Sequence, residues 1–367
     1  MIVYTSICMN YMPKALILGK SLKKYNKNIK FYVIMVEREI PKEVTTEMYD
    51  IIDKIILAKD LGYEDFDKFI FKHSIVEAST SVKGQALLYL LEHEKEDKVV
   101  YIDPDIKIYN KFTKLDKLLD SNDIILTPHV TSPEGNERDI INNELGSLKY
   151  GAYNLGFLAV SNTDEGLRFA KWWRDRLNLY CYDDIPNGIF TDQKWVDLAP
   201  GMFNVYILKD EGYNMAPWNL STRKLYKDED GELCVNNKYK LVFFHFSGFD
   251  SGANLERFEY YVKNKEALEF QIRNEYIEDL KEAKHGELGN YKWSYSCFNS
   301  GEKILNEVRQ VYRKRKFFLW VEKNPFEYSN KFFNDLFGIN IKHKISISTL
   351  GRKIKAGLIK IKILFYK

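Results

Sequence analysis

The sequence predicts an α/β protein with a doubly wound, mostly parallel sheet and a helical C-terminal region. Over roughly the first 250 residues, short apolar runs alternate with stretches of helical periodicity, which is the pattern of βαβ units. After residue 253 this alternation stops, and opposite charges recur four residues apart, as on exposed helices. We therefore expect three parts: an α/β domain at 1–253, a helical region packed on it at 254–338, and a basic amphipathic tail at 339–367.

The elements of the α/β domain begin with a βαβ unit. Residues 1–5 form a β-branched and aromatic strand, residues 13–25 a helix, and residues 30–36 a continuous apolar strand, so these two strands should be parallel. Further strands are predicted at 53–57, 98–102, 123–127, 156–160 and 241–246, and helices at 82–92, 165–177, 255–284 and 301–318. In a doubly wound sheet, ligands bind beyond the carboxyl ends of the strands.

Composition excludes several classes of protein. The 367 residues are 45% hydrophobic and 29% charged, which is typical of a soluble globular chain and excludes disordered and fibrous ones. The net charge of +3 conceals an asymmetry, because residues 301–367 hold 16 Lys and Arg but only 5 Asp and Glu. The basic character therefore belongs to the C-terminal part.

Cysteine and histidine spacing gives no sign of a zinc site or a disulfide framework. The six histidines form no HExxH pair, and no CxxC joins the four cysteines, Cys8, Cys181, Cys234 and Cys297. A reducing compartment fits this pattern. The N-terminus lacks the features of a signal peptide, and no run approaches 18 apolar residues, so we expect a cytoplasmic protein.

The most informative segment is Asp103-Pro104-Asp105, which directly follows the strand at 98–102. Two carboxylates at this spacing on extended backbone suit Mn²⁺ or Mg²⁺, which bind to one or two carboxylates together with substrate phosphates. A simple turn after a strand is the alternative explanation. The chain has neither a GxxxxGK[ST] motif nor a GxGxxG after its first strand, so P-loop and dinucleotide sites lose their main support.

Three further motifs follow in order, and together they resemble a known family. They are Asn154-Leu-Gly156, Asp192-Gln193 and His245-Phe-Ser-Gly248. A strand-terminal Asp-x-Asp followed by these motifs resembles the GT-A-fold glycosyltransferases, and in particular glycosyltransferase family 8. The resemblance spans roughly residues 1–250 and implies a GT-A-type fold with a sugar-transferase activity.

The resemblance implies roles for particular residues. Asp103, Asp105 and His245 would hold Mn²⁺ or Mg²⁺, and Asp103 would also contact the nucleotide sugar. The remaining nucleotide-sugar contacts would come from Thr5, Lys83 and the backbone of Gly248.

The catalytic residues implied by the resemblance are Asn154, Asp192 and Gln193, which would contact the donor sugar beside its reacting carbon. Each assignment has a structural alternative. His245 would otherwise be a core histidine, Asn154 a turn cap, and Asp192 the N-cap of a helix. The aromatic and amide-rich segment 213–223 suits a sugar surface and equally a packed loop.

One position departs from the family. Where the family has a lysine and an aromatic residue shortly after His-x-x-Gly, this chain has Phe249-Asp250-Ser251. The usual cation for the diphosphate is therefore missing, and we expect Arg223 or Arg257 to replace it.

The predicted activity is metal-dependent transfer of a hexose from a UDP-sugar to a hydroxyl of a glycan, lipid-linked or protein acceptor, in polysaccharide or cell-surface glycan biosynthesis. By resemblance, the transfer retains the anomeric configuration. Two alternatives stay open. A sugar-phosphate nucleotidylyltransferase needs a glycine-rich N-terminal loop, yet residues 5–12 contain no glycine. A non-catalytic membrane-surface scaffold would use only the tail.

The tail at 340–367 carries eight Lys and Arg and no Asp or Glu, interleaved with Ile, Leu and Phe. Basic amphipathic segments bind anionic membrane surfaces. A solvated tail or a nucleic-acid contact is the alternative. We expect peripheral association with the inner face of a membrane and no nucleic-acid partner.

Overall fold

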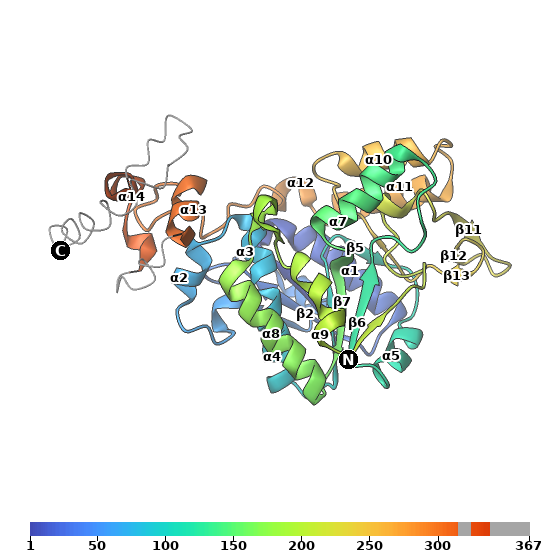
Figure 1. Ribbon diagram of the computed structural model, residues 1–367, viewed down its shortest axis with the longest axis horizontal. Helices are drawn as coiled ribbons and strands as arrows, with labels where there is room; N and C mark the ends of the chain where they lie inside the picture. Colours follow the sequence, from blue (N-terminus) through green and yellow to red (C-terminus); the bar gives the residue numbers. More distant parts are fainter. Residues whose placement is uncertain (315–323, 338–367) are drawn as a thin grey trace. The chain divides into compact units, whose positions relative to one another are not determined.

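The computed structural model describes residues 1–314 and 324–337 (Figure 1). These residues belong to two compact units. The first combines Met1–Tyr63 with Val76–Trp293, and the second combines Glu64–Ile75 with the chain from Ser294 onward. Residues 254–293 thus fold within the first unit, while the predicted three-part division of the chain stays a prediction. The tail at 339–367 lies outside the described residues.

The first unit is built on a seven-stranded sheet with the order β10-β6-β7-β4-β1-β2-β3. Its strands are β1 (Ile2–Ile7), β2 (Lys30–Met35), β3 (Lys54–Leu57), β4 (Lys98–Ile102), β6 (Ile124–Pro128), β7 (Tyr153–Ser161) and β10 (Val205–Ile207). β7 runs antiparallel to β4 and β6, and the other neighbouring strands are parallel. The predicted α/β class with a mostly parallel sheet is confirmed.

One face of this sheet is covered by α1 (Met12–Tyr25) and α5 (Thr113–Leu119). Alternate side chains of the strands point to this face, as the two-residue repeat of a strand requires. They pack with apolar side chains of both helices, and the buried set includes Val3, Val33, Val100, Phe157, Leu18, Leu22, Leu115 and Leu119. This cluster fixes α1 against the sheet.

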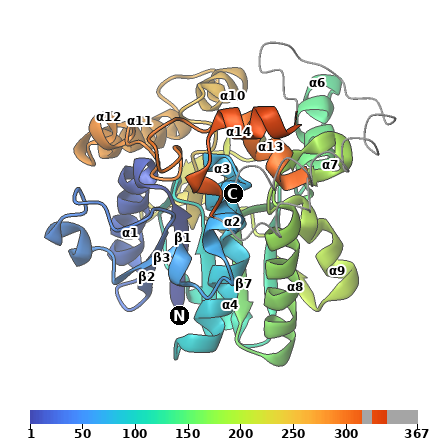
Figure 2. The same cartoon turned by 90° about the vertical axis from the view of Figure 1, so that its left-hand side faces the viewer.

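The opposite face carries α4 (Lys83–His93) and α8 (Asp164–Tyr180), which lie side by side in both views (Figures 1 and 2). Tyr4 on β1 points to this face, since its hydroxyl donates to the carbonyl of Lys83. A Cβ at Gly84 would lie 2.8 Å from the Cα of Arg174, so this glycine allows the backbones of α4 and α8 to approach closely. The start of α4 is thereby held in place.

The strand expected at 241–246 is present as β14 (Phe243–His245), but it does not join the main sheet. It pairs antiparallel with β5 (Ile106–Ile108), a strand that the sequence pattern did not reveal. The helix expected at 255–284 is two helices, α10 (Ala253–Tyr261) and α11 (Leu268–Glu282). They are separated by a turn in which the side chain of Asn264 accepts from the backbone of Glu266.

Several further helices and strands are short. They are α3 (Ile75–Ser81), α6 (Glu137–Asp139), a π-helix (Ile140–Leu145), α7 (Gly146–Tyr150), α9 (Ala199–Met202), α12 (His285–Leu288), β8 (Asp183–Asp184), β9 (Ile189–Phe190), and the small sheet of β11 (Leu225–Lys227), β12 (Leu233–Val235) and β13 (Tyr239–Lys240). Short 3₁₀ helices lie at Met9–Tyr11, Thr46–Asp50, Ala58–Asp60, Ile185–Asn187, Lys194–Leu198, Pro217–Asn219 and Pro325–Glu327.

The second unit is held together by aromatic rings. It contains α2 (Phe66–Phe71), α13 (Asn306–Lys314) and α14 (Asn330–Phe337). The ring of Phe71 lies 4.8 to 5.9 Å from four others, those of Phe298, Tyr312, Phe326 and Phe333. Buried Arg309 donates to the carbonyl of Phe71. Within 1–314 and 324–337, no helix combines the length and the apolar character needed to cross a bilayer.

Candidate metal centre

The carboxyl end of β4 is the point where three segments distant in sequence meet. Asp103 follows β4 directly, and its N–H donates to the carbonyl of Gly156 on the neighbouring strand β7 at 2.9 Å. Asp105 immediately precedes β5. His245 pairs with Ile106 in the register of β14 and β5, so its ring comes to lie beside Asp105.

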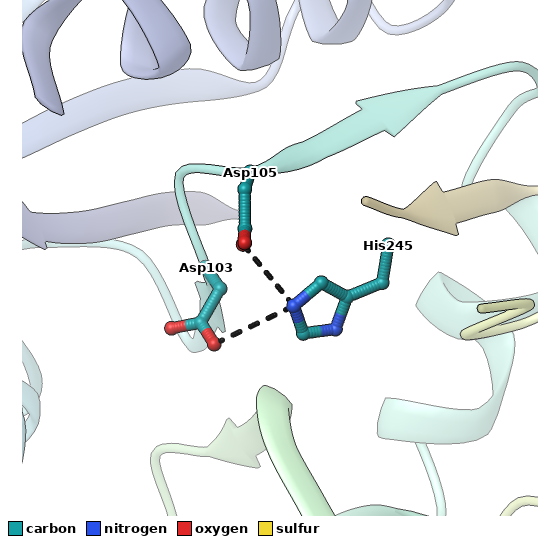
Figure 3. A group of neighbouring side chains, drawn as sticks. All are labelled: Asp103, Asp105 and His245. Carbon is teal, nitrogen blue, oxygen red and sulfur yellow. Dashed lines mark ion pairs between the residues drawn. The ribbon is translucent and has the colours of Figure 1, made fainter. Parts of the chain in front are cut away.

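Asp103, Asp105 and His245 form a compact group, which we call the metal group. Each residue offers one ligand atom, and these atoms lie within 4.8 Å of one another. His245 Nε2 is 3.1 Å from Asp105 Oδ1 and 3.9 Å from Asp103 Oδ2 (Figure 3). Two carboxylate oxygens and one imidazole nitrogen suit Mn²⁺ or Mg²⁺ better than a soft metal. The donor set therefore fits the divalent metal that the motifs predicted.

Electrostatic interactions hold the Asp105 carboxylate in its charged form. Burial alone would raise the pKa of Asp105, but the charge and hydrogen bond of His245, together with the charge of Lys14, lower it to about 2. Burial favours the neutral ring of His245, yet Asp105 raises the pKa of the imidazole above its ordinary value. The excess negative charge thus attracts a cation, either a proton on His245 or a metal ion.

Lys83, at the start of α4, lies between two carboxylates. Its ammonium is 3.1 Å from Asp103 Oδ1 and 2.9 Å from Asp192 Oδ2, and it sits 4.2 Å from the ring centroid of Tyr101. Burial opposes the charge, but Asp103 and Asp192 raise the pKa of Lys83 well above its usual value. Burial raises the pKa of Asp192, although the charge of Lys83 opposes this rise. Lys83 is the cation that joins the metal group to Asp192.

A network of amides continues from this pair. The Asn154 oxygen accepts from the N–H of Gly156 and from the Asn214 side chain, while its amide nitrogen lies 3.3 Å from Gln193 Oε1 and 3.1 Å from His129 Nε2. All four hydrogen-bonding positions of Asn154 are thereby engaged. Gln193 also accepts from the N–H of Leu155, and it donates to the carbonyl of Tyr150.

The structure thus brings seven of the predicted site residues into one connected group: Asp103, Asp105, His245, Lys83, Asp192, Asn154 and Gln193. Thr5 is fully buried on β1, and among the residues described its hydroxyl has no hydrogen-bond partner. Gly248 lies in the turn after β14 with φ of 72°, and its carbonyl accepts from the N–H of Asn254. The functional roles of these nine residues stay predictions.

Four residues of the site were missed by the sequence analysis or left undecided. The Tyr101 hydroxyl donates to Asp103, and His129 and Asn214 contact Asn154. Trp218 packs edge-on against His245, with ring centroids 5.2 Å apart. Two sequence features could have indicated these residues: His129 closely follows a predicted strand, and segment 213–223 is rich in aromatic and amide side chains.

The two arginines proposed for the diphosphate are engaged elsewhere. Arg223 is 2% exposed, and its guanidinium donates to the carbonyls of Glu211, Tyr213 and Asn214. Arg257 donates to the side chain of Asn143 at 2.7 Å. Both guanidinium groups therefore serve internal contacts, and the expectation that one of them replaces the missing lysine finds no support.

No protein-family model matches the chain. The chain is 28% identical over 161 residues to the uncharacterized protein YfnF of Bacillus subtilis strain 168, and the match covers 42% of this chain and 50% of that protein. The match therefore spans half the length of that curated relative.

Among solved structures, the chain is similar to the galactosyltransferase LgtC in complex with donor and acceptor sugar analogs, with 18% identity, a TM-score of 0.39, and coverage of 68% of this chain and 87% of that one. It is also similar to the glycosyltransferase GlyE of Streptococcus pneumoniae TIGR4, with 16% identity, a TM-score of 0.42, and coverage of 81% and 66%. Both are glycosyltransferases, the class that the motifs resemble. Because these TM-scores are below 0.5, the functional assignment rests on the site itself.

Proposed function

We propose that this chain is a divalent-metal-dependent glycosyltransferase that moves a hexose from a nucleoside diphosphate sugar, expected to be a UDP-sugar, to an acceptor hydroxyl. The observation that carries this proposal is the convergence of Asp103, Asp105 and His245 beyond the carboxyl end of β4, next to the buried Lys83–Asp192 pair. Ligands of α/β sheets bind at this edge. The site thus combines a metal-binding group with polar side chains for a sugar.

The chemistry requires that a diphosphate leaves as the glycosidic bond breaks. Mn²⁺ or Mg²⁺ held by Asp103, Asp105 and His245 would neutralise the charge that develops on this leaving group. Lys83 holds Asp103 and Asp192 in position through its two ion pairs. Asp192 and Gln193 would contact the sugar near its reacting carbon. Asn154 was predicted to do the same, but its hydrogen-bonding positions are engaged within the protein, so it would instead hold Gln193 in place.

Transfer with retention of anomeric configuration is consistent with this set of side chains. The departing phosphate can take the acceptor proton, so no strongly basic side chain is required at the reacting carbon. The acceptor would be a glycan, a lipid-linked saccharide or a protein, in the synthesis of polysaccharide or cell-surface glycans. The basic tail would bring a cytoplasmic enzyme to the inner membrane face, where such acceptors lie.

A screen of nucleotide sugars for hydrolysis, with and without Mn²⁺, tests the proposal. We expect donor hydrolysis that requires the metal, disappears in excess EDTA and is lost in Asp105→Asn. The matched control is Asp116→Asn, which neutralises an exposed carboxylate paired with Lys98 on the surface. Formation of a nucleotide sugar from a nucleoside triphosphate would favour the nucleotidylyltransferase, and absence of any nucleotide binding would favour the scaffold.

A further inference from the structure

Lys14 is a buried cation that belongs neither to the metal group nor to the network around Lys83 and Asp192. It lies in the first turn of α1, is 1% exposed, and has its ammonium 4.3 Å from the ring centroid of Tyr11. Lysine is almost never fully buried unless it is paired. Its ion-pair partner is Asp250, at 2.5 Å between Nζ and Oδ2.

One contact joins the helix of Lys14 to the strand that follows Asp105. The N–H of Ile108 on β5 donates to the hydroxyl of Ser21 on α1 at 3.0 Å. The charge of Lys14 also contributes, after His245, to the lowered pKa of Asp105.

Asp250 comes from the turn that follows β14 and carries Gly248. The N–H of Phe246 donates to the carbonyl of Asp105 at 2.8 Å, so this turn begins beside the metal group. Asp250 is 42% exposed at its side chain, whereas Lys14 beneath it is 2% exposed. The Asp250 carboxylate also accepts from the Tyr11 hydroxyl at 3.2 Å, and its Oδ1 lies 3.4 Å from His285 Nε2.

Two glycines flank Asp250 in this turn. Gly248 and Gly252 both have left-handed φ values, of 72° and 81°, and they lie two residues to either side of Asp250. Glycine adopts this region without steric cost and can leave it as easily. A half-exposed carboxylate on such a turn can be displaced by a stronger anion.

We propose that Lys14 is the cation that binds the diphosphate of the donor, and that Asp250 occupies its ammonium until the diphosphate arrives. This inference rests on the proposed function. It assigns the diphosphate cation to α1 in place of the lysine that is missing after His245-x-x-Gly248, where this chain has an acidic residue instead. Asp250 is then a competitor of the diphosphate, with the same charge sign and the same partner.

Two substitutions with opposite expected effects test the inference. Lys14→Met keeps the length of the side chain and leaves Asp250 in contact with solvent, so the fold should persist. Because a charge-assisted hydrogen bond is lost, UDP binding in the presence of Mn²⁺ should weaken about tenfold or more. Asp250→Asn removes the competing carboxylate and should tighten UDP binding.

The measurement is calorimetric titration of the full chain with UDP at fixed Mn²⁺. A parallel titration uses pyrophosphate, which presents the diphosphate without the nucleoside. Lys20→Met on the exposed side of the same helix is the matched control and should change neither affinity. A Mn²⁺ titration of each variant should still show binding, because neither Lys14 nor Asp250 is among the three residues proposed to hold the metal.

The inference is wrong if Lys14→Met binds UDP within about twofold of wild type, or if Asp250→Asn weakens binding as Lys14→Met does, the behaviour of a purely structural ion pair. If the unmodified chain binds Mn²⁺ but neither UDP nor pyrophosphate, the proposed function fails and this inference fails with it. UDP binding by wild type with no loss in Lys14→Met would overturn the inference alone.

Discussion

Gly156 lies directly against the imidazole of His245. A Cβ at this position would be 2.4 Å from Cε1 and 2.7 Å from Nδ1 of the ring. These are distances that packed atoms do not reach, so any larger residue would push the ring away from Asp105. The glycine of the Asn-x-Gly motif is therefore required by the histidine of another motif, 89 residues further along the chain.

Gly156→Ala should disrupt metal binding more than folding. We expect Mn²⁺ affinity to fall at least about tenfold and the free energy of unfolding to fall by about 1–3 kcal/mol, the usual cost of overpacking. Mn²⁺ titration and thermal unfolding measure the two effects. Gly201→Ala is the control, because its Cβ would meet no atom within 4 Å. Unchanged Mn²⁺ affinity in Gly156→Ala would contradict the assignment of His245 as a ligand.

Asp105→Ala should abolish sugar transfer and metal-dependent UDP binding. The change removes one of the two carboxylates proposed to bind the metal, but it should alter the free energy of unfolding by no more than about 2 kcal/mol, since a carboxylate beyond a strand end supports little of the core. Activity and UDP titration are compared with the control Asp116→Ala. Full activity of Asp105→Ala, or of the wild type in excess EDTA, would contradict the metal site.

Asp192→Asn should lower turnover without weakening UDP binding. Its carboxylate is expected to interact with the donor sugar as the transition state forms, so its loss should reduce kcat by about 100-fold, as for other groups that stabilise developing charge. UDP affinity should stay within about threefold of wild type, because the nucleotide is not its partner. Asp175→Asn, at an exposed ion pair on α8, is the control. A loss of UDP affinity comparable to the loss of turnover would show that Asp192 acts on the nucleotide.

Mn²⁺ affinity should fall as the pH is lowered from about 8 to 5. Burial favours neutral His245, but Asp105 raises the pKa of the ring above 6.5, so a proton competes with the metal near neutral pH. Asp105, with a pKa of about 2, stays ionised throughout. The metal-free protein should behave oppositely, because the stability contributed by charged His245 is present below its unfolded pKa and is lost as the pH rises through the raised folded pKa. Mn²⁺ titrations and Tm measurements across this range test both signs.

The full chain should sediment with anionic vesicles and not with neutral ones. Each Lys or Arg of the tail near the surface contributes about 1 kcal/mol to binding, and salt should weaken the attraction. A version of the chain that ends at Gly338 should stay in the supernatant. Equal sedimentation of the two versions would reject a membrane role for the tail.

The class of fold and most of the residue types of the site could be predicted from local sequence patterns. Alternating apolar strands and amphipathic helices are local patterns, so β4 was placed at its observed bounds, 98–102, and the first βαβ unit to within one to two residues. The carboxylates at the end of β4 could likewise be located, because a strand end and an Asp-x-Asp are both visible in a few consecutive residues.

The way in which these residues meet depends on long-range packing and could not be predicted from the sequence. Parallel and antiparallel buried strands have the same apolar pattern, so the antiparallel β7 could not be distinguished from its neighbours. The contact of His245 with Asp105 depends on pairing between β5 and β14, which are more than 130 residues apart, and Lys14 meets Asp250 across an even longer separation. Such contacts leave no local signal, because they are selected by packing of the whole domain and not by the propensity of either segment.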